Sequence, residues 1–435
     1  MSLKTTSDTI PQDPESQLEV LKRGTIDIVG EEELLEKLRR SCRENMPLRV
    51  KLGLDPTAPD IHIGNAIPIH KLRKFQELGH QAVLIIGDYT AMVGDPAGVN
   101  KTRPMLSREE VMANAGTYLQ QARKILDLSR TEIVYNSQWF EKMGFSEILR
   151  LASKMTLARK LERDDFSKLY AARIPISLHE FLYPLMQGYD SVMVRSGVEL
   201  GGTDQLFNLL VGRDLQRDFG QEPQVALTTP LLEGIDGNKK MSKSLGNYIG
   251  IIEEPAQIFG KAMSIRDELM KKYFVLATDL DDERIAELLS PDIHPRQAKA
   301  ELAKAIVRRY WGEEAAEQAA QEFDKVFKAH ELPEEIPEVV VPRGELKDGK
   351  LWIVRLLVLA GFASSNSEAR RLIAQGGVYI FPYSGVKLLR PRFPEAEAHQ
   401  YRVTDPNDEI PIAPVVAPQI LKVGPRRFAR VVVKD

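Results

Sequence analysis

The chain has 435 residues, of which 43% are hydrophobic and 28% are charged, with a formal net charge of −3. This length exceeds one typical domain, and the composition excludes a disordered or fibrous chain. No apolar run reaches the ~20 residues of a membrane span, and the polar N-terminus resembles neither a signal peptide nor a transit peptide. Cys42 is the single cysteine, which excludes an internal disulfide and a multi-cysteine metal site. We therefore expect a reducing, cytoplasmic location and no membrane partner.

The first part of the chain has the pattern of a βαβ unit. A helix rich in Glu and Leu is predicted at 31–45, after a segment whose first 15 residues look disordered. Residues 48–54 predict a strand, and residues 66–78 have the apolar spacing of a helix. The continuous apolar run 81–87 is typical of a strand buried on both faces. Strand, helix and strand within about 40 residues predict a parallel sheet.

The rest of the chain divides into a helical insertion, a further strand at 224–227, an alanine-rich helical region, a Pro- and Glu-rich linker and a last small domain. The predicted boundaries are an N-terminal extension at 1–30, a catalytic domain at 31–250 with a mostly helical insertion at about 105–195, an all-helical domain at 251–330, a linker at 331–350 and a small C-terminal domain at 351–435.

Residues 55–65 (DPTAPDIHIGN) carry the first chemical signal, between the first predicted strand and the next helix. Ligands of open parallel sheets bind at this edge, and a helix N-terminus there offers N–H groups to a phosphate. Gly64 would let a nucleotide approach the backbone, and His62 can donate hydrogen bonds to phosphate oxygens. Taken alone, a histidine in this place is more often a capping or packing residue.

Residues 240–244 (KMSKS) carry the second signal, in a glycine-rich stretch that predicts a mobile loop. Lys240 and Lys243 are flexible cations suited to a polyphosphate. Most Lys-rich stretches are solvated loops, but this five-residue string arises by chance in roughly one of several thousand chains of this length.

Together, these two motifs resemble the HIGH and KMSKS signatures of class I aminoacyl-tRNA synthetases. The segments 183–190 (YPLMQGYD), 201–205 (GGTDQ) and 87–96 (GDYTAMVGDP) resemble the substrate sites of tyrosyl-tRNA synthetases. The resemblance extends from about residue 20 to 435 and points to a bacterial-type subgroup with KLG at 51–53. It implies an α/β fold with a Rossmann-like, doubly wound parallel sheet, an all-helical domain for the anticodon region of tRNA and a small α+β RNA-binding domain.

The same resemblance implies the reaction. L-tyrosine and Mg-ATP would form tyrosyl-adenylate and pyrophosphate, and the tyrosyl group would pass to the terminal ribose of tRNA(Tyr). It also implies a homodimer, with Mg²⁺ entering alongside ATP and no structural metal. Catalysis would rest on positioning and electrostatic stabilisation, because no residue looks like a covalent nucleophile.

Roles for individual residues follow from the resemblance as well. Asp190 would accept a hydrogen bond from the substrate phenol, and Asp204 would bind the ribose. The implied tyrosine-binding residues are Lys51, Thr90, Asp95, Tyr183, Gln187, Asp190 and Gln205. The implied ATP-binding residues are Gly53, Asp55, Thr57, His62, Gly64, Asn65, Gly202, Asp204 and Lys243. The implied catalytic residues are His62, Asn65, Lys240, Lys243, Ser244 and the mobile-loop Arg103.

The residues themselves support a pocket and also depart from the family pattern. Tyr183, Gln187 and Asp190 share one helical face, and flanking apolar residues argue against free exposure of that face. Asn65 replaces the second His of the family signature, and Lys51 stands where many members have a tyrosine. Lys51 can instead keep Asp190 ionised. The alternative to a substrate contact is a salt bridge from Asp190 to a nearby cation such as Lys51.

The C-terminal segment 365–379 (SNSEARRLIAQGGVY) resembles a small RNA-binding domain first described in a ribosomal small-subunit protein. Arg370 and Arg371 would meet RNA phosphates from a short helix. Residues 351–435 contain 12 Lys and Arg against 7 Asp and Glu, a net +5 that leaves −8 for the rest of the chain. On charge alone, an anion-binding end and a merely solvated basic domain are equally good interpretations. Residues 381–400 look longer than the hairpin expected there.

Three alternatives compete with this assignment. The C-terminal module argues against a smaller nucleotidyltransferase with the same His-x-Gly element. The presence of His62, Lys240 and Asp95 argues against a non-catalytic RNA-binding relative. The three polar residues on the predicted helical face argue against a tryptophanyl enzyme.

Overall fold

The computed structural model describes residues 13–95, 106–328, 336–381, 401–412, 419–424 and 427–434. They belong to two compact units, Met1–Gln321 and Glu322–Asp435. None of the helices in these ranges is long and apolar enough to cross a membrane.

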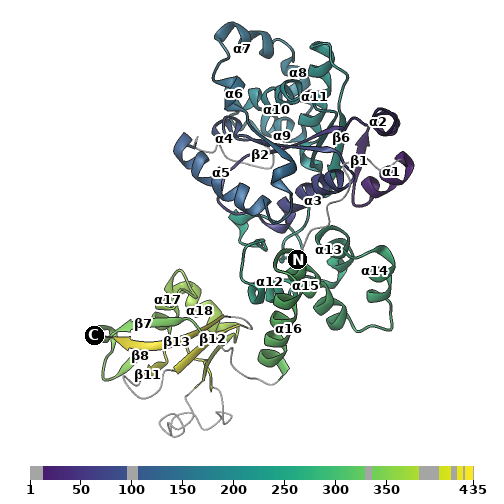
Figure 1. The fold of residues 1–435 in the computed structure, drawn as a ribbon. Coiled ribbons are helices and arrows are strands. Elements are labelled where there is room, and N and C mark those ends of the chain that lie inside the picture. Colours follow the sequence, from purple (N-terminus) through teal and green to yellow (C-terminus); the bar gives the residue numbers. More distant parts are fainter. Residues whose placement is uncertain are drawn as a thin grey trace. The chain divides into compact units, whose positions relative to one another are not determined.

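The first unit is built on a six-stranded sheet of order β1-β6-β5-β2-β3-β4 (Figure 1). Five strands are parallel, and β1 pairs antiparallel with β6. Along the chain, the sheet grows from β2 through β3 to β4 and then resumes on the other side of β2 with β5. In open parallel sheets, the crevice at such a reversal is where ligands bind. The strands are β1 (Asp27–Val29), β2 (Arg49–Leu54), β3 (Gln81–Ile86), β4 (Thr131–Tyr135), β5 (Val198–Gly202) and β6 (Val225–Thr229).

Helices cover this sheet, with α3 (Ile63–Glu77) drawn below it and α10 (Tyr183–Met193) and α11 (Leu206–Asp218) above it in Figure 1. Two glycines let α10 and α11 approach closely, since a Cβ on Gly188 would lie 3.1 Å from the backbone nitrogen of Gly212. The remaining helices of this part are α1 (Pro14–Lys22), α2 (Glu31–Glu44), α4 (Thr90–Val93), α5 (Arg108–Ala122), α6 (Ser137–Phe140), α7 (Phe145–Ala152), α8 (Leu157–Lys160) and α9 (Asp164–Ala171).

Most of the elements predicted in this part are present, and two differences stand out. The region expected to be mostly helical contains β4 at the sheet edge. Residues 14–29 are not a separate extension, because α1 buries Leu18 and Leu21 and β1 hydrogen-bonds to β6. Each difference involves a short edge strand, β4 or β1, which carries little sequence pattern of its own.

The helical pattern predicted after residue 250 is also present, and these helices pack into the same compact unit as the sheet up to Gln321. His70 of α3 lies 3.1 Å (Nε2 to Oη) from Tyr310, and both side chains are buried. The helices are α12 (Pro255–Ala262), α13 (Met270–Ala277), α14 (Asp282–Leu288), α15 (Pro295–Trp311) and α16 (Glu313–Lys328).

In the described residues of the second unit, a five-stranded sheet has the order β10-β9-β12-β13-β7, β11 pairs with β8, and α17 and α18 are the α-helices after β8. β7 lies inside the stretch that was predicted as a linker. This segment forms a strand because its valines pair in parallel with those of β13 and because Val341 packs in the core. Of the segment 381–400, which looks longer than the short hairpin expected there, all but Phe381 lies outside the described residues. The elements are β7 (Glu338–Pro342), β8 (Lys350–Trp352), α17 (Ile353–Leu359), α18 (Asn366–Ala374), β9 (Val378–Phe381), β10 (Tyr401–Arg402), β11 (Glu409–Pro411), β12 (Gln419–Val423) and β13 (Arg427–Lys434).

Candidate active site

The predicted site residues of the first unit gather at the carboxyl ends of the parallel strands and at the start of α3. Asp55 follows β2, Thr90 follows β3, Asn136 follows β4, and Gly202 ends β5. These strand ends flank the reversal of strand order between β2 and β5. The sheet topology therefore brings together segments that are far apart in the sequence.

His62 is the N-cap of α3, and its Nδ1 accepts a hydrogen bond from the backbone N–H of Asn65 at 3.1 Å. Because Nδ1 is the acceptor, a neutral ring carries its proton on Nε2. Burial lowers the pKa of His62 to about 3, and the nearby charges of Lys243 and Lys240 act in the same direction. His62 thus caps the helix and also offers an uncharged N–H donor at neutral pH. A Cβ on Gly64 would lie 3.1 Å from Nδ1, so a glycine keeps the ring in place.

The KMSKS segment lies against the same helix start. Backbone hydrogen bonds join Ile63 to Ile249 (2.9 Å) and Ile251 to Ile61 (3.0 Å), which ties the end of this loop to the first motif. These two backbone hydrogen bonds hold the two motifs close together whatever their side chains do.

The motif's polar side chains have partners in the same region. Lys243 Nζ is 3.5 Å from the Tyr118 hydroxyl and 5.5 Å from the centre of its ring. Burial lowers the pKa of the Lys243 amine. Lys240 forms an ion pair with Asp204 at 2.6 Å, and Ser244 lies 2.9 Å from the hydroxyl of Ser242.

Asp55 is the centre of a second group of side chains. It accepts hydrogen bonds from the Tyr183 hydroxyl and from Thr90 Oγ1, both at 2.8 Å. Burial raises the pKa of Asp55 to about 6, although these two donors oppose the shift. A Cβ on Gly87 would lie 2.0 Å from Asp55 Oδ1, so only glycine leaves room for this cluster.

Asp190 lies on the same helix as Tyr183 and Gln187 and is buried. Its carboxylate accepts from Trp139 Nε1 at 3.0 Å and from Asn136 Nδ2 at 3.3 Å. Burial raises the pKa of Asp190 to about 7 against the effects of the Lys51 charge and these two donors. Asn136 and Trp139 were not predicted, because the strand that delivers them was not recognised; the apolar run Ile133-Val-Tyr135 before Asn136 was the available signal.

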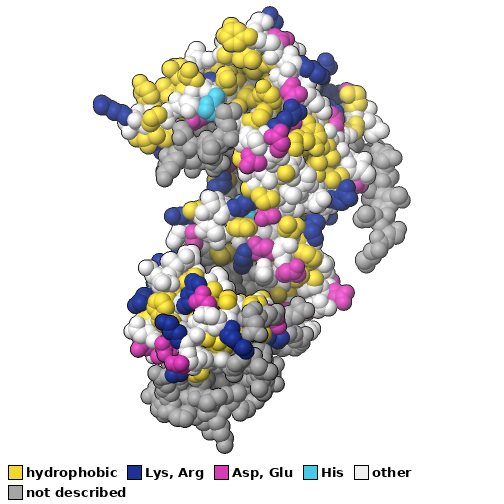
Figure 2. Space-filling view, turned by 90° about the vertical axis from the view of Figure 1, so that its left-hand side faces the viewer, with side chains coloured by type: hydrophobic (Ala, Val, Ile, Leu, Met, Phe, Trp, Pro, Cys, Tyr) yellow, Lys and Arg dark blue, Asp and Glu magenta, His cyan; other side chains and the backbone are white. Residues whose placement is uncertain are grey.

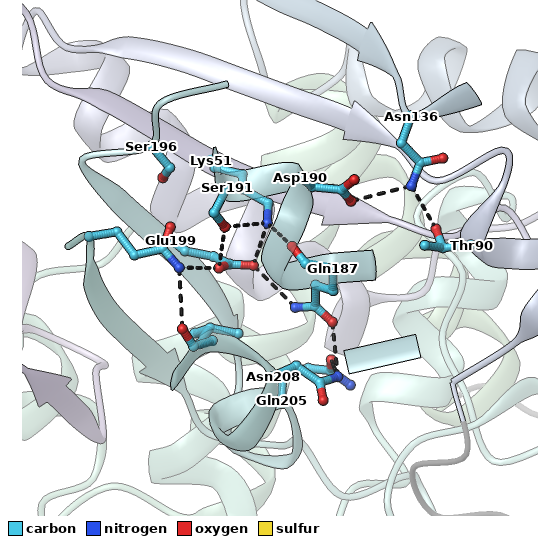
Figure 3. A network of polar contacts seen from close by, with 12 residues as sticks. Lys51, Thr90, Asn136, Gln187, Asp190, Ser191, Ser196, Glu199, Gln205 and Asn208 are labelled. Carbon is cyan, nitrogen blue, oxygen red and sulfur yellow. Dashed lines mark hydrogen bonds and ion pairs between the residues drawn. The ribbon is translucent and has the colours of Figure 1, made fainter. Parts of the chain in front are cut away.

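Lys51 does not pair with Asp190, so the alternative of a salt bridge between these two residues is wrong (Figure 3). Lys51 is fully buried and forms an ion pair with Glu199 at 2.9 Å. It also donates to Ser191 Oγ at 2.7 Å and to the backbone carbonyl of Gln187 at 2.8 Å. Glu199 escaped the sequence analysis because a carboxylate in a strand has no recognisable pattern.

Asp95 lies in a further polar cluster. It accepts from Arg163 at 2.8 Å and from Gln205 Nε2 at 2.6 Å. Asn208 joins this cluster to α10, donating to Gln205 Oε1 at 3.0 Å and to Gln187 Oε1 at 2.9 Å. The predicted tyrosine-site residues are therefore linked through two side chains that were not predicted, Arg163 and Asn208.

The other predicted residues lie as follows. Gly53, Thr57 and Asn65 are exposed, which leaves their surfaces open to a ligand. Arg103 lies outside the described residues. In the part of the chain that the structure describes, no group of three or more His, Cys, Asp or Glu is placed to hold a metal ion.

Arg370 and Arg371 lie on α18 of the second unit, and both are exposed. Arg370 stacks over the ring of Trp352 at 5.4 Å, whereas Arg371 lies 3.8 Å from Glu368. Lys and Arg side chains are also visible on the face of this unit in Figure 2.

Comparison with known proteins agrees with these features. The family model described as tRNA synthetases class I (W and Y) matches residues 43–328. A tyrosine–tRNA ligase of Moorella thermoacetica is 50% identical over 425 residues, which cover 97% of this chain and 97% of the relative. One of Carboxydothermus hydrogenoformans is 51% identical over 421 residues, covering 96% and 97%.

Among solved structures, a C-terminally truncated mitochondrial tyrosyl-tRNA synthetase of Aspergillus nidulans has a similar fold, with a TM-score of 0.60 at 23% identity. It covers 72% of this chain and 94% of its own. The family match and the near full-length relatives lead to the same conclusion: the chain belongs to the tyrosine–tRNA ligase family of class I tRNA synthetases.

Proposed function

We propose that the chain activates L-tyrosine with Mg-ATP to give tyrosyl-adenylate and pyrophosphate, and then transfers the tyrosyl group to the 3′-terminal ribose of tRNA(Tyr). The observation that carries this proposal is the buried Asp190 carboxylate on α10, the helix that also bears Tyr183 and Gln187. A carboxylate has about four lone-pair sites, and Trp139 and Asn136 use two of them. The remaining capacity suits the hydroxyl of a phenol.

The opposite end of the pocket suits an α-ammonium group. Tyr183 donates its own proton to Asp55 and therefore meets a ligand with its lone pairs. The Asp95 carboxylate and the Gln187 amide oxygen are further acceptors, and an ammonium group is a donor only. Gln205, which bonds Asp95, would orient the substrate carboxylate.

The start of α3 and the KMSKS loop would bind ATP. In this assignment, Gly53, Thr57, Gly64 and Gly202 line the approach, and Asp204 meets the ribose once its ion pair with Lys240 opens. The tyrosine carboxylate attacks the α-phosphate, and the bond to pyrophosphate breaks. His62, Lys240, Lys243, Ser244 and Arg103 stabilise the charge on the departing pyrophosphate, and Asn65 adds a side-chain donor.

Mg²⁺ belongs to the nucleotide substrate in this proposal, and it neutralises phosphate charge when bound. We assign it no protein ligand. The second unit would bind tRNA through Arg370 and Arg371, because exposed arginines suit phosphate contacts. A homodimer and a cytoplasmic location are part of the proposal and rest on the resemblance to the family.

The decisive experiment is ATP–pyrophosphate exchange with each of the twenty amino acids. Tyrosine should support exchange, and the other nineteen should support little. Tryptophan is the informative competitor, because the matching family model includes enzymes for both amino acids and an indole N–H can also donate to a carboxylate. Exchange driven by tryptophan, or by no amino acid, would overturn the proposal.

A further inference from the structure

Glu199 of β5 is the centre of a buried polar network beside the tyrosine pocket (Figure 3). Lys51 and Glu199 are both buried and lie 2.9 Å apart. Ser191 Oγ donates to Glu199 Oε2 at 3.0 Å, and Gln224 Nε2 donates to the same oxygen. A Cβ on Gly212 would lie 3.2 Å from this oxygen, so α11 closes the network from behind.

This network holds Gln187 at two points. Gln187 Nε2 donates to Glu199 Oε1 at 3.1 Å, and the Gln187 backbone carbonyl accepts from Lys51 at 2.8 Å. An ionised carboxylate only accepts hydrogen bonds, so the NH₂ group of the Gln187 amide must face Glu199. The amide oxygen must then face the other way, toward Asn208.

The oxygen side of the Gln187 amide is fixed, through Asn208, by Arg163, which is a hydrogen-bond donor where Glu199 is an acceptor. Arg163 only donates hydrogen bonds, and it donates to Asn208 Oδ1 at 3.0 Å. Asn208 must therefore present its NH₂ group to the Gln187 oxygen, which it does at 2.9 Å. The donor-only Arg163 and the acceptor-only Glu199 thus impose the same amide orientation from opposite ends.

We propose that Glu199, held in place by Lys51, is a positioning residue for the α-ammonium end of the pocket. It turns the Gln187 amide so that its oxygen, and not its NH₂ group, faces the ammonium group of the substrate. The inference rests on the proposed function and adds to it that Lys51 acts through Glu199 and does not touch the phenol.

Two double variants distinguish the positioning of the Gln187 amide from an effect of the Lys51 and Glu199 charges. Lys51→Met/Glu199→Met removes both charges and the acceptor for Gln187 Nε2. Lys51→Met/Glu199→Gln removes both charges but keeps an acceptor oxygen. In the second variant, Gln224 can rotate its amide to match, because its Oε1 has no partner among the described residues. Removing both members of a buried ion pair avoids leaving one charge unpaired.

The readout is the affinity for L-tyrosine compared with that for 3-(4-hydroxyphenyl)propionate, which lacks the α-amine. In the methionine pair, tyrosine should bind about tenfold more weakly, whereas the desamino compound should change by less than about twofold. In the glutamine pair, both affinities should stay within about threefold of the wild type. Lys37→Met, which removes a buried lysine of α2 that pairs with Glu222, is the control and should change neither affinity.

Equal losses for both ligands would overturn the inference, as would a folded methionine pair with unchanged tyrosine affinity. An equal tyrosine loss in the methionine and glutamine pairs would overturn it too. If the methionine pair does not fold, Lys51→Leu/Glu199→Leu replaces it with the same expectations and is compared with the glutamine pair in the same way. Failure of the proposed function is distinguishable, because the wild-type chain would then show no tyrosine-dependent pyrophosphate exchange.

Discussion

Replacement of Asp190 by asparagine tests the proposed phenol-binding end of the site with almost no change in the shape of the side chain. The variant keeps one acceptor oxygen but replaces the other by a donor, which then faces Trp139 or Asn136. Hydrogen bonds to charged groups contribute about 1.5–3 kcal/mol. Since about 1.4 kcal/mol is a factor of ten in rate, Asp190→Asn should lower kcat/KM for tyrosine by about 10- to 100-fold.

Phenylalanine provides the internal reference for this variant. It has no hydroxyl, so it loses no hydrogen bond when Asp190 is replaced. In the wild type, it leaves the remaining acceptor capacity of the buried carboxylate unused. The ratio of the tyrosine and phenylalanine values of kcat/KM should therefore fall by the same 10- to 100-fold, within about a factor of three.

The pH dependence gives an independent test of the same carboxylate. Asp190 has a pKa raised to about 7 by burial. Below pH 7 it is protonated and no longer a charged acceptor, so wild-type kcat/KM for tyrosine should fall as the pH drops through 7. The asparagine variant should lack this limb, while any limb from Asp55, whose pKa is raised to about 6, should remain.

Stability should change in the opposite sense to activity. The pKa of Asp190 is higher in the folded chain than its ordinary value of 3.8, so its contribution to the free energy of unfolding is present below about pH 4. That contribution is lost as the pH rises toward 7. Between pH 5 and pH 8, the variant should gain at most about 3 kcal/mol relative to the wild type, as measured by denaturant unfolding.

The control for this variant is Asp88→Asn. Asp88 is also buried, but it accepts hydrogen bonds from the backbone N–H and hydroxyl of Ser137. Its replacement should affect the two substrates equally. An unchanged tyrosine-to-phenylalanine ratio in a folded Asp190→Asn enzyme would remove Asp190 from the phenol site.

Three further changes test other parts of the assignment. Lys243→Ala should slow single-turnover adenylate formation by about 100-fold and leave tyrosine binding intact. Lys239→Ala, which changes the exposed neighbour of the motif, should alter neither the rate nor the binding. An unaltered rate in Lys243→Ala would show that this lysine takes no part in catalysis. Gly87→Ala should weaken tyrosine binding by about tenfold in equilibrium titration, because its Cβ would displace Asp55; a normal affinity would show that the Asp55 cluster does not shape the pocket. A chain that ends at Lys328, before β7, should keep pyrophosphate exchange and charge tRNA poorly, and loss of both activities would contradict the division of labour between the two units.

The fold could be predicted where a segment is long and its apolar pattern is strong. β2, α3 and β3 follow each other with buried, regularly spaced apolar residues, and the sequence alone predicts a parallel unit there. β1 has three residues and β4 five partly buried ones, so neither has a pattern that separates it from a loop or a helix. β7 was not predicted, because its valines form a strand through pairing with β13, which is distant in the sequence.

The site shows a similar limit. His62, Lys243 and Asp190 were predicted from short motifs, in which several candidate residues lie close together in sequence. Glu199 and Arg163 belong to no such motif, and they meet the others only through the packing of β5, α10 and α11. Sequence therefore predicts the groups expected to contact substrates better than the groups that orient them.

The carboxylates around the proposed pocket differ in their partners, and this difference supports the proposed position of the substrate. Glu199 has a cation, Lys51, at ion-pair distance. Asp55 and Asp190 have only neutral donors among the described residues, and burial raises the pKa of both. A core built for stability would not retain two such carboxylates, because a buried charge without a cation costs free energy. They are explained if a ligand brings the missing donors. The phenol hydroxyl of tyrosine would reach Asp190, and its ammonium group would reach the end of the pocket that Asp55 organises through Tyr183. The two raised pKa values thus lie at the two ends of the proposed substrate.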